Sequence, residues 1–141
     1  MTFPSPDAPA RGPGDTESPL VLIVDDNEQN RKLARDVLRA AGFRTLEAAS
    51  GVEGIALAAE HLPDVVLMDV QLPDMNGTDA ARKLAEGTLT ARIPIVALSA
   101  LQFEGSGDWL LAAGFAGYLE KPFDVGDFPG QVRRYCTSVG A

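Results

Sequence analysis

Three aspartates stand where apolar runs of the sequence end, and carboxylates are the ligands that hard divalent cations prefer. Asp25 and Asp26 follow the run LVLIV at 20–24, and Asp69 follows VVLM at 65–68. Apolar runs of this length are typical of strands buried on both faces of a parallel sheet. If the two strands are neighbours, the three carboxylates converge and repel one another. A bound Mg²⁺, with Mn²⁺ as the alternative, would relieve that repulsion.

A hydroxyl and an ammonium group stand at the ends of two further apolar runs. Ser99 ends IPIVALS at 93–99, and Lys121 follows GYLE at 117–120. A carboxylate beside Mg²⁺ and a lysine can attack phosphorus and form an aspartyl phosphate. The lysine and the hydroxyl would stabilise the transferring group, and no general base is needed because a carboxylate is ionised at neutral pH. We therefore predict that Asp69 accepts a phosphoryl group.

The elements that must position these residues alternate along the chain. We expect strands over 20–24, 43–48, 65–68, 93–99 and 117–120, and helices over 27–41, 52–59, 79–86, 104–113 and 128–135. Right-handed crossovers then predict an α/β fold, a flavodoxin-like (βα)5 doubly wound parallel sheet with strand order 2-1-3-4-5. Ligands of such sheets bind beyond the carboxyl ends of the strands, near the switch point between strands one and three.

Helix caps offer a purely structural interpretation of some of these residues. Asp25, Asp26 or Asn27 can cap the helix that follows them. Thr78 is expected to cap the helix over 79–86, and Asp127 the last helix. Capping explains single residues, but it does not explain why aspartates, serine and lysine all stand at one predicted edge of the sheet.

Length and composition predict one folded domain. Residues 1–18 hold four prolines and two glycines and are expected to be a disordered tail, followed by the domain at 19–138 with no output domain after it. The chain has no apolar run long enough for a membrane span and no signal peptide, which predicts a cytoplasmic protein. With a net charge of −8 and no basic cluster, it is not expected to bind nucleic acid. Its single Cys136 excludes an internal disulfide.

Four segments together resemble the receiver domain of two-component response regulators. They are VDDN at 24–27, VVLMDVQLPDMNG at 65–77, ALSA at 97–100 and GYLEKPF at 117–123. The resemblance extends over about residues 19–136 and is greatest to stand-alone CheY-like receivers of the DivK type.

The resemblance implies roles for the matching positions. Asp69 would be the phosphoacceptor and a metal ligand, Asp26 would bind Mg²⁺ directly, and Asp25 would act largely through water. The backbone carbonyl of Gln71 would be a further ligand. The donor would be a histidine kinase or a histidine phosphotransfer protein. Like its relatives, the chain would catalyse its own phosphorylation and dephosphorylation without being an enzyme for other substrates.

The resemblance also implies how the signal leaves the domain. Ser99 and Lys121 would contact the phosphoryl group, and Tyr118 would be the aromatic switch residue. An output protein would then be recognised through the fourth helix, the fifth strand and the fifth helix, or the phosphoryl group would be passed on. Candidate surface residues are Leu101, Phe103, Trp109 and Tyr118. Both a monomer and a phosphorylation-dependent homodimer fit this scheme.

Three other functions are open to an aspartate at this position. A phosphatase of the haloacid-dehalogenase type would carry a second acid two residues after the nucleophile, where this chain has Gln71. A flavodoxin that holds FMN would not place Asp25 and Asp26 against a phosphate. A receiver-like interaction module that works without phosphorylation would not need the whole set of site residues.

We further hypothesise that Leu101, together with Gln71, limits the access of water to the acyl phosphate, because many relatives carry a polar group at the position of Leu101. Leu101→Glu should then change the rate at which the phosphorylated protein loses its phosphoryl group. Following the decay of the phosphoprotein with time measures this rate, and an unchanged half-life would contradict the hypothesis.

Overall fold

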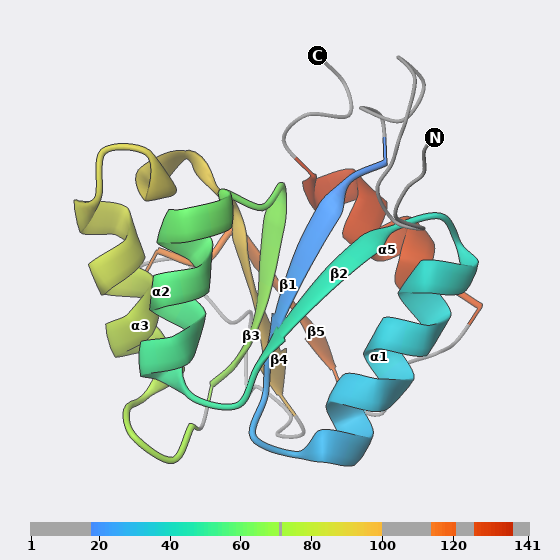
Figure 1. Cartoon of the computed structure of the whole chain (residues 1–141), viewed down its shortest axis with the longest axis horizontal. Coiled ribbons are helices and arrows are strands. Elements are labelled where there is room, and N and C mark those ends of the chain that lie inside the picture. The colour runs from blue at the N-terminus through green and yellow to red at the C-terminus, as the bar shows by residue number, and fades with distance from the viewer. Residues whose placement is uncertain (1–17, 71, 100–113, 121–125, 137–141) are drawn as a thin grey trace, which may run out of the picture.

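The fold is a five-stranded parallel sheet covered by helices on both faces (Figure 1). The computed structural model describes residues 18–70, 72–99, 114–120 and 126–136. The strand order is β2-β1-β3-β4-β5, as the sequence predicts. The strands are β1 (Leu20–Val24), β2 (Arg44–Ala48), β3 (Val65–Asp69), β4 (Ile95–Ser99) and β5 (Gly117–Glu120).

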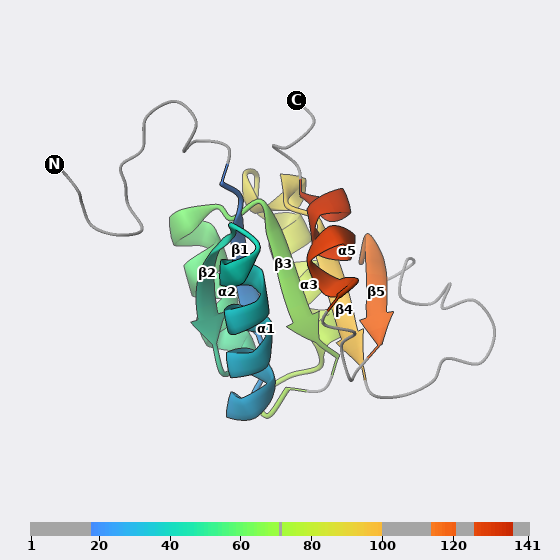
Figure 2. The same ribbon diagram turned by 90° about the vertical axis from the view of Figure 1, so that its right-hand side faces the viewer.

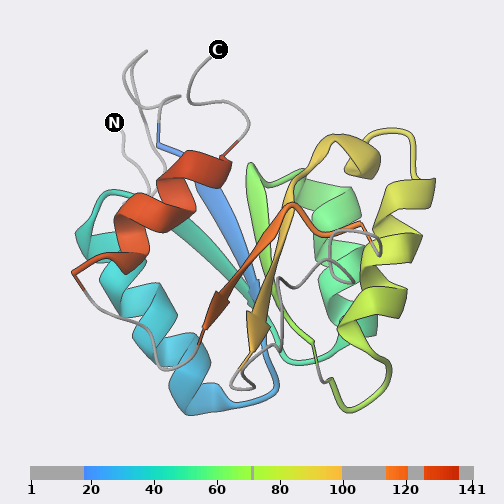
Figure 3. The ribbon, with the colours of Figure 1, turned by 180° about the vertical axis from the view of Figure 1, so that it is seen from behind.

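Helices α1 and α5 cover one face of the sheet, and α2 and α3 cover the other (Figures 1 and 3). Their bounds are α1 (Glu28–Ala40), α2 (Gly51–His61), α3 (Gly77–Glu86) and α5 (Phe128–Tyr135), and a short 3₁₀ helix η2 (Thr90–Arg92) precedes β4. The helix predicted over 104–113 lies outside the described residues. The arrangement of the described helices is the doubly wound one that right-handed crossovers produce.

The core consists of two apolar clusters, one on each face of the sheet. Leu22 and Val24 of β1 belong to the cluster under α2 and α3, whereas Val21 and Ile23 belong to the cluster under α1 and α5. All four side chains are buried. Because both faces are covered, β1 needs apolar residues at every position, which is why its sequence shows no alternation.

The last helix is anchored in the cluster under α1 and α5 by residues of one of its faces. Phe128 and Val132 are buried there, and Tyr135 packs against them. Cys136 is buried beside them, and burial is the main reason that its pKa rises to about 11. The thiol is therefore a packed group that stays protonated at neutral pH.

The helix ends follow the predictions in part. Asn27 is the N-cap of α1, and its side chain accepts a hydrogen bond from the N–H of Asn30 at 3.0 Å. The prediction that Thr78 caps the third helix is wrong, because the N-cap is Asn76 and the helix begins at Gly77. Asp127 stands at the N-cap of α5 but makes no side-chain cap hydrogen bond. Helix α3 starts early because Gly77 packs directly on the preceding strand, as described below.

The register of β1 determines which loops meet at the edge of the sheet. β1 pairs with β2 on one side and with β3 on the other, with Val24 opposite both Ala48 and Met68. The strands pair in parallel, so the loops that follow β1 and β3 emerge at the same edge of the sheet, the edge toward which the arrows of β3, β4 and β5 point in Figure 2. Within the described residues, no helix is both long enough and apolar enough to cross a membrane.

The end of α2 shows a local strain that the sequence did not reveal. Leu62, the C-cap residue, has φ 49° and ψ 62°, which is the left-handed conformation that a side chain disfavours. Pro63 follows and disfavours the right-handed helical conformation for the residue before it. The chain therefore leaves the helix through Leu62, at a cost of roughly 1–2 kcal/mol.

Leu62→Gly should raise the free energy of unfolding by about 1 kcal/mol, because glycine adopts this conformation freely and the leucine is 42% exposed. Urea unfolding at neutral pH measures the change. Leu89 is the matched control, since it is 54% exposed but has φ −88° and ψ −38°. Leu89→Gly should lower stability, and a loss of stability in both variants would contradict the strain at Leu62.

Candidate functional site

Three aspartates meet at the carboxyl edge of β1 and β3. One oxygen from each of Asp25, Asp26 and Asp69 can be chosen so that all three lie within 4.8 Å of one another. Asp25 is 1% exposed, Asp26 is exposed and Asp69 is half-buried. The structure thus brings together the carboxylates that the sequence predicted to converge, in a cluster that opens to solvent at Asp26.

The turn after β1 holds its two aspartates in different environments. The N–H of Asp25 donates to the carbonyl of Ala48 at 3.0 Å, which extends the pairing of β1 with β2 by one residue. One carboxylate oxygen of Asp25 accepts the N–H of Asn27 at 2.9 Å. Because Asn27 caps α1, neither aspartate is required as the side-chain cap, so the purely structural interpretation of this pair is not needed.

The loop after Asp69 is folded back on the strand that it leaves. The N–H of Gly77 donates to the carbonyl of Val70 at 2.7 Å. A Cβ atom at Gly77 would lie 2.5 Å from the carbonyl oxygen of Asp69 and 2.9 Å from the Cα of Val70. A side chain at this position would displace the main chain of Asp69, so the first residue of α3 must be glycine if the carboxylate is to stay in place.

Asp74 ties the same loop to the N-terminus of α2. Its two carboxylate oxygens accept the N–H groups of Gly51 and Val52 at 2.8 and 2.9 Å. Ser50, the N-cap of α2, accepts the N–H of Glu53 with its hydroxyl at 3.2 Å. A helix N-terminus leaves several N–H groups without partners inside the helix, and Asp74 satisfies two of them from a distant part of the chain. These bonds, the one from Gly51 first, hold the pKa of Asp74 below its usual value.

Of the other predicted site residues, Ser99 and Tyr118 lie on strands of the sheet. Ser99 is the last residue of β4, and that strand pairs with β3. Tyr118 of β5 pairs with Ala97 of β4. Its side chain is partly buried and packs against the cluster under α2 and α3. Gln71 and Lys121 lie outside the described residues, as do the surface residues Leu101, Phe103 and Trp109.

The donor set suits a hard divalent cation. The described ligand atoms are carboxylate oxygens, and the metal–oxygen distance of Mg²⁺ is about 2.1 Å, so its ligands lie up to about 4 Å apart. The spacing of the three aspartates, 4.8 Å or less, needs only small side-chain movements to meet this geometry. The residues present therefore fit Mg²⁺, and Mn²⁺ accepts similar donors.

Comparison with known proteins gives the family to which this fold and aspartate cluster belong. The model of the response regulator receiver domain matches residues 21–133, and the chain belongs to this family. It is 37% identical over 115 residues to the polar-differentiation response regulator DivK of Brucella ovis, a match that covers 82% of this chain and 94% of that protein.

Solved structures with the same fold include a chemotaxis protein and part of a kinase. The chemotaxis response regulator CheY4 of Vibrio cholerae superposes with a TM-score of 0.76 at 29% identity, over 84% of this chain and 98% of that one. The receiver domain of the sensor histidine kinase PA1611 of Pseudomonas aeruginosa gives 0.77 at 31% identity, over 88% and 99%. That receiver was crystallised with a magnesium ion coordinated in its active-site cleft.

Sequence reasoning missed the residues that support the aspartates. Asp74 and Gly77 belong to a segment rich in turn residues, and the pair Asn76-Gly77 indicates a turn but not the contacts with α2 and with Asp69. Arg31, whose guanidinium donates to the carbonyl of Asp25, had no signal in the sequence. Its other partner, Glu47, is 16 residues away and on a different element.

Asp74→Asn should lower the free energy of unfolding at pH 7, because an amide has one acceptor oxygen for two N–H groups. The pKa of Asp74 is lowered by folding, so its contribution is fully present above the ordinary aspartate pKa of about 3.9 and is lost as the pH falls through the lower folded value. The stability difference between parent and variant should therefore shrink in acid, as urea unfolding at pH 7 and pH 3 measures.

Asp127→Asn is the control for this prediction. It removes the same charge beside another helix N-terminus, where the side chain makes no cap hydrogen bond. It should change stability less than Asp74→Asn does. Equal losses in the two variants would show that charge near a helix end, and not the two hydrogen bonds, stabilises the loop.

Proposed function

We propose that this receiver domain accepts a phosphoryl group on Asp69 from a phosphohistidine, in a reaction that depends on Mg²⁺. The observation that carries the proposal is the meeting of Asp25, Asp26 and Asp69 within 4.8 Å at the edge where β3 ends. A cluster of three carboxylates is costly without a cation, and a carboxylate beside a bound cation is poised to attack phosphorus.

In the proposed reaction, a carboxylate oxygen of Asp69 forms a bond to phosphorus while the bond from phosphorus to the donor's imidazole nitrogen breaks. The imidazole leaves with the electron pair, and the product is an acyl phosphate. The hydroxyl of Ser99 and the ammonium group of Lys121 would bind oxygens of the transferred group. Hydrolysis of the acyl phosphate would reset the protein, so the chain catalyses only its own modification and demodification.

The residues that would hold Mg²⁺ are Asp25, Asp26 and Asp69, with the backbone carbonyl of Gln71 as a further ligand. When bound, the ion would neutralise negative charge on the phosphoryl group as it moves. The exposed Asp26 is better placed for direct contact with a solvated ion than Asp25, whose carboxylate is buried and already accepts the N–H of Asn27. The magnesium-bound receiver of PA1611 supports this assignment by its overall similarity.

The proposed partners are a histidine kinase or a histidine phosphotransfer protein on the input side, in the cytoplasm. Phosphorylation adds charge and acceptor oxygens at the edge of the sheet, which would favour one of two arrangements of Tyr118 and the neighbouring surface. The output would then be contact with another protein, with a second copy of this chain, or transfer of the phosphoryl group onward.

Incubation with Mg²⁺ and acetyl phosphate or phosphoramidate should add the mass of one phosphoryl group to the intact protein. Chelation of Mg²⁺ with EDTA should prevent the gain, and Asp69→Asn should abolish it because an amide is not a nucleophile at neutral pH. Intact-protein mass spectrometry measures the change. Hydroxylamine should remove the added group, as it does from acyl phosphates.

Asp79→Asn is the control, because Asp79 is a carboxylate of the first turn of α3 that pairs with Arg82 and is not part of the aspartate cluster. It should be phosphorylated like the parent. A chain that binds Mg²⁺ but gains no mass with any donor would overturn the proposal and favour an interaction module that works without phosphorylation.

A further inference from the structure

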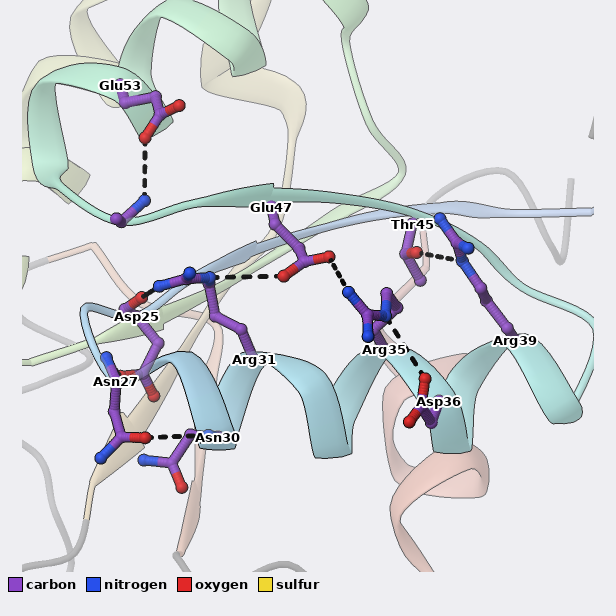
Figure 4. Close-up of polar contacts among 11 residues, drawn as sticks. Asp25, Asn27, Asn30, Arg31, Arg35, Asp36, Arg39, Thr45, Glu47 and Glu53 are labelled. Carbon is purple, nitrogen blue, oxygen red and sulfur yellow. Dashed lines mark hydrogen bonds and ion pairs between the residues drawn. The ribbon is translucent and has the colours of Figure 1, made fainter.

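An arginine of α1 reaches back to the main chain between the two aspartates that follow β1 (Figure 4). The Nη1 of Arg31 donates to the carbonyl oxygen of Asp25 at 2.7 Å, and its Nε donates to Glu47 at 3.3 Å. The second carboxylate oxygen of Glu47 accepts Nη1 of Arg35 at 2.9 Å. The side chain of Arg31 is only 16% exposed, so its guanidinium is held between the helix and β2.

These bonds hold Asp25 from both sides. Its N–H donates to the carbonyl of Ala48 on β2, and its carbonyl accepts Arg31 from α1. The carbonyl of Asp25 belongs to the peptide group that joins Asp25 to Asp26. The orientation of this peptide sets the direction in which Asp26 leaves the strand, so Arg31 acts on the geometry of the aspartate pair without contacting either carboxylate in the bonds described.

We infer that Arg31 is a positioning residue for the metal-binding aspartates, with Glu47 as the group that holds its guanidinium in place. The inference rests on the proposed function, because it concerns the affinity of that site for Mg²⁺. Hydrogen bonds to the groups behind a metal site orient its ligands, and their loss weakens metal binding without removing a ligand.

The charge of Arg31 and its hydrogen bond to Asp25 predict opposite changes in Mg²⁺ affinity when Arg31 is replaced. A cation beside three carboxylates repels Mg²⁺, so removal of the guanidinium through charge alone would tighten binding. Loss of the hydrogen bond to Asp25 would instead let the peptide turn and would weaken binding. Glu47 accepts hydrogen bonds from both Arg31 and Arg35 and neutralises part of their charge, so the positional effect dominates.

The matched control is another arginine of the same helix. Arg39 also bonds across from α1 to β2, from its Nε to the hydroxyl of Thr45 at 2.8 Å, two turns away from Arg31. Arg39→Met removes the same charge and the same kind of contact between helix and strand. It leaves the main chain of the aspartates unchanged, so it separates general loosening of α1 from the specific effect on the site.

The experiment is a titration of the full chain with MgCl₂ by isothermal titration calorimetry, with thermal melting to show that each variant is folded. Arg31→Met should raise the Kd for Mg²⁺ by about tenfold, and Arg39→Met should leave it within about twofold of the parent. If Arg31→Met does not fold, Arg31→Gln gives the same comparison, because glutamine is too short to keep both contacts of the guanidinium.

A folded Arg31 variant that binds Mg²⁺ as tightly as the parent, or more tightly, would overturn the inference. So would an equal weakening in the Arg39 variant, which would show a general effect of α1. A parent chain that binds no Mg²⁺ would overturn the proposed function together with this inference. Binding by the parent with no effect of Arg31 would overturn the inference alone.

Discussion

The parallel pairing of β1 with β3 brings the carboxylates of Asp25, Asp26 and Asp69 close together at one edge of the sheet. At separations of 4.8 Å or less, two carboxylates repel by about 3 kcal/mol or more if the effective dielectric constant is about 20. The core cannot relieve this repulsion by letting the strands slide, because β1 is buried on both faces and pairs on both sides. The energy of folding therefore maintains a site whose charges favour a cation.

The groups around the aspartates fix the main chain more than they neutralise charge. Glycine at position 77 lets α3 pack on the carbonyl of Asp69, and Asp74 docks the loop between them on the N-terminus of α2. On the other side, Ala48 and Arg31 bind the N–H and the carbonyl of Asp25. The proposed exchange of a cation and a phosphoryl group would then need no refolding, because the backbone of the site is held by partners outside the proposed chemistry.

Much of the fold was predictable because its signals are local. Continuous apolar runs identified β1, β3 and β4, and Gly42, with φ 98°, stands just after the first helix, where glycine commonly ends a helix. Right-handed crossovers then led to the observed strand order. The convergence of three aspartates followed from that order alone. The start of α3 was predicted wrongly because its reason is not local: Gly77 is held by the main chain of Asp69, so the cap is Asn76 and Thr78 lies within the helix.

The supporting contacts of the site could not be predicted for the same reason. Each joins residues that are far apart in sequence: Asp74 to Gly51, and Arg31 to Glu47. Many exposed aspartates and arginines look alike in a sequence, and only the packing of helices on the sheet selects those that reach a backbone group. The strained Leu62 is similar, since Pro63 showed that the helix must end but not which conformation the preceding residue would adopt.

Successive side chains of β5 point to opposite faces of the sheet, so a change at the aspartates that moved one of them would affect the packing on one face only. Tyr118 packs on the side of α2 and α3, whereas its neighbour Leu119 belongs to the cluster under α1 and α5. A rotation of Tyr118 would thus alter packing on the first side and leave the second cluster, which anchors α5 through Phe128, in place. If Tyr118 is the switch residue, the packing that responds to the site and the packing that anchors α5 would lie on opposite faces of β5.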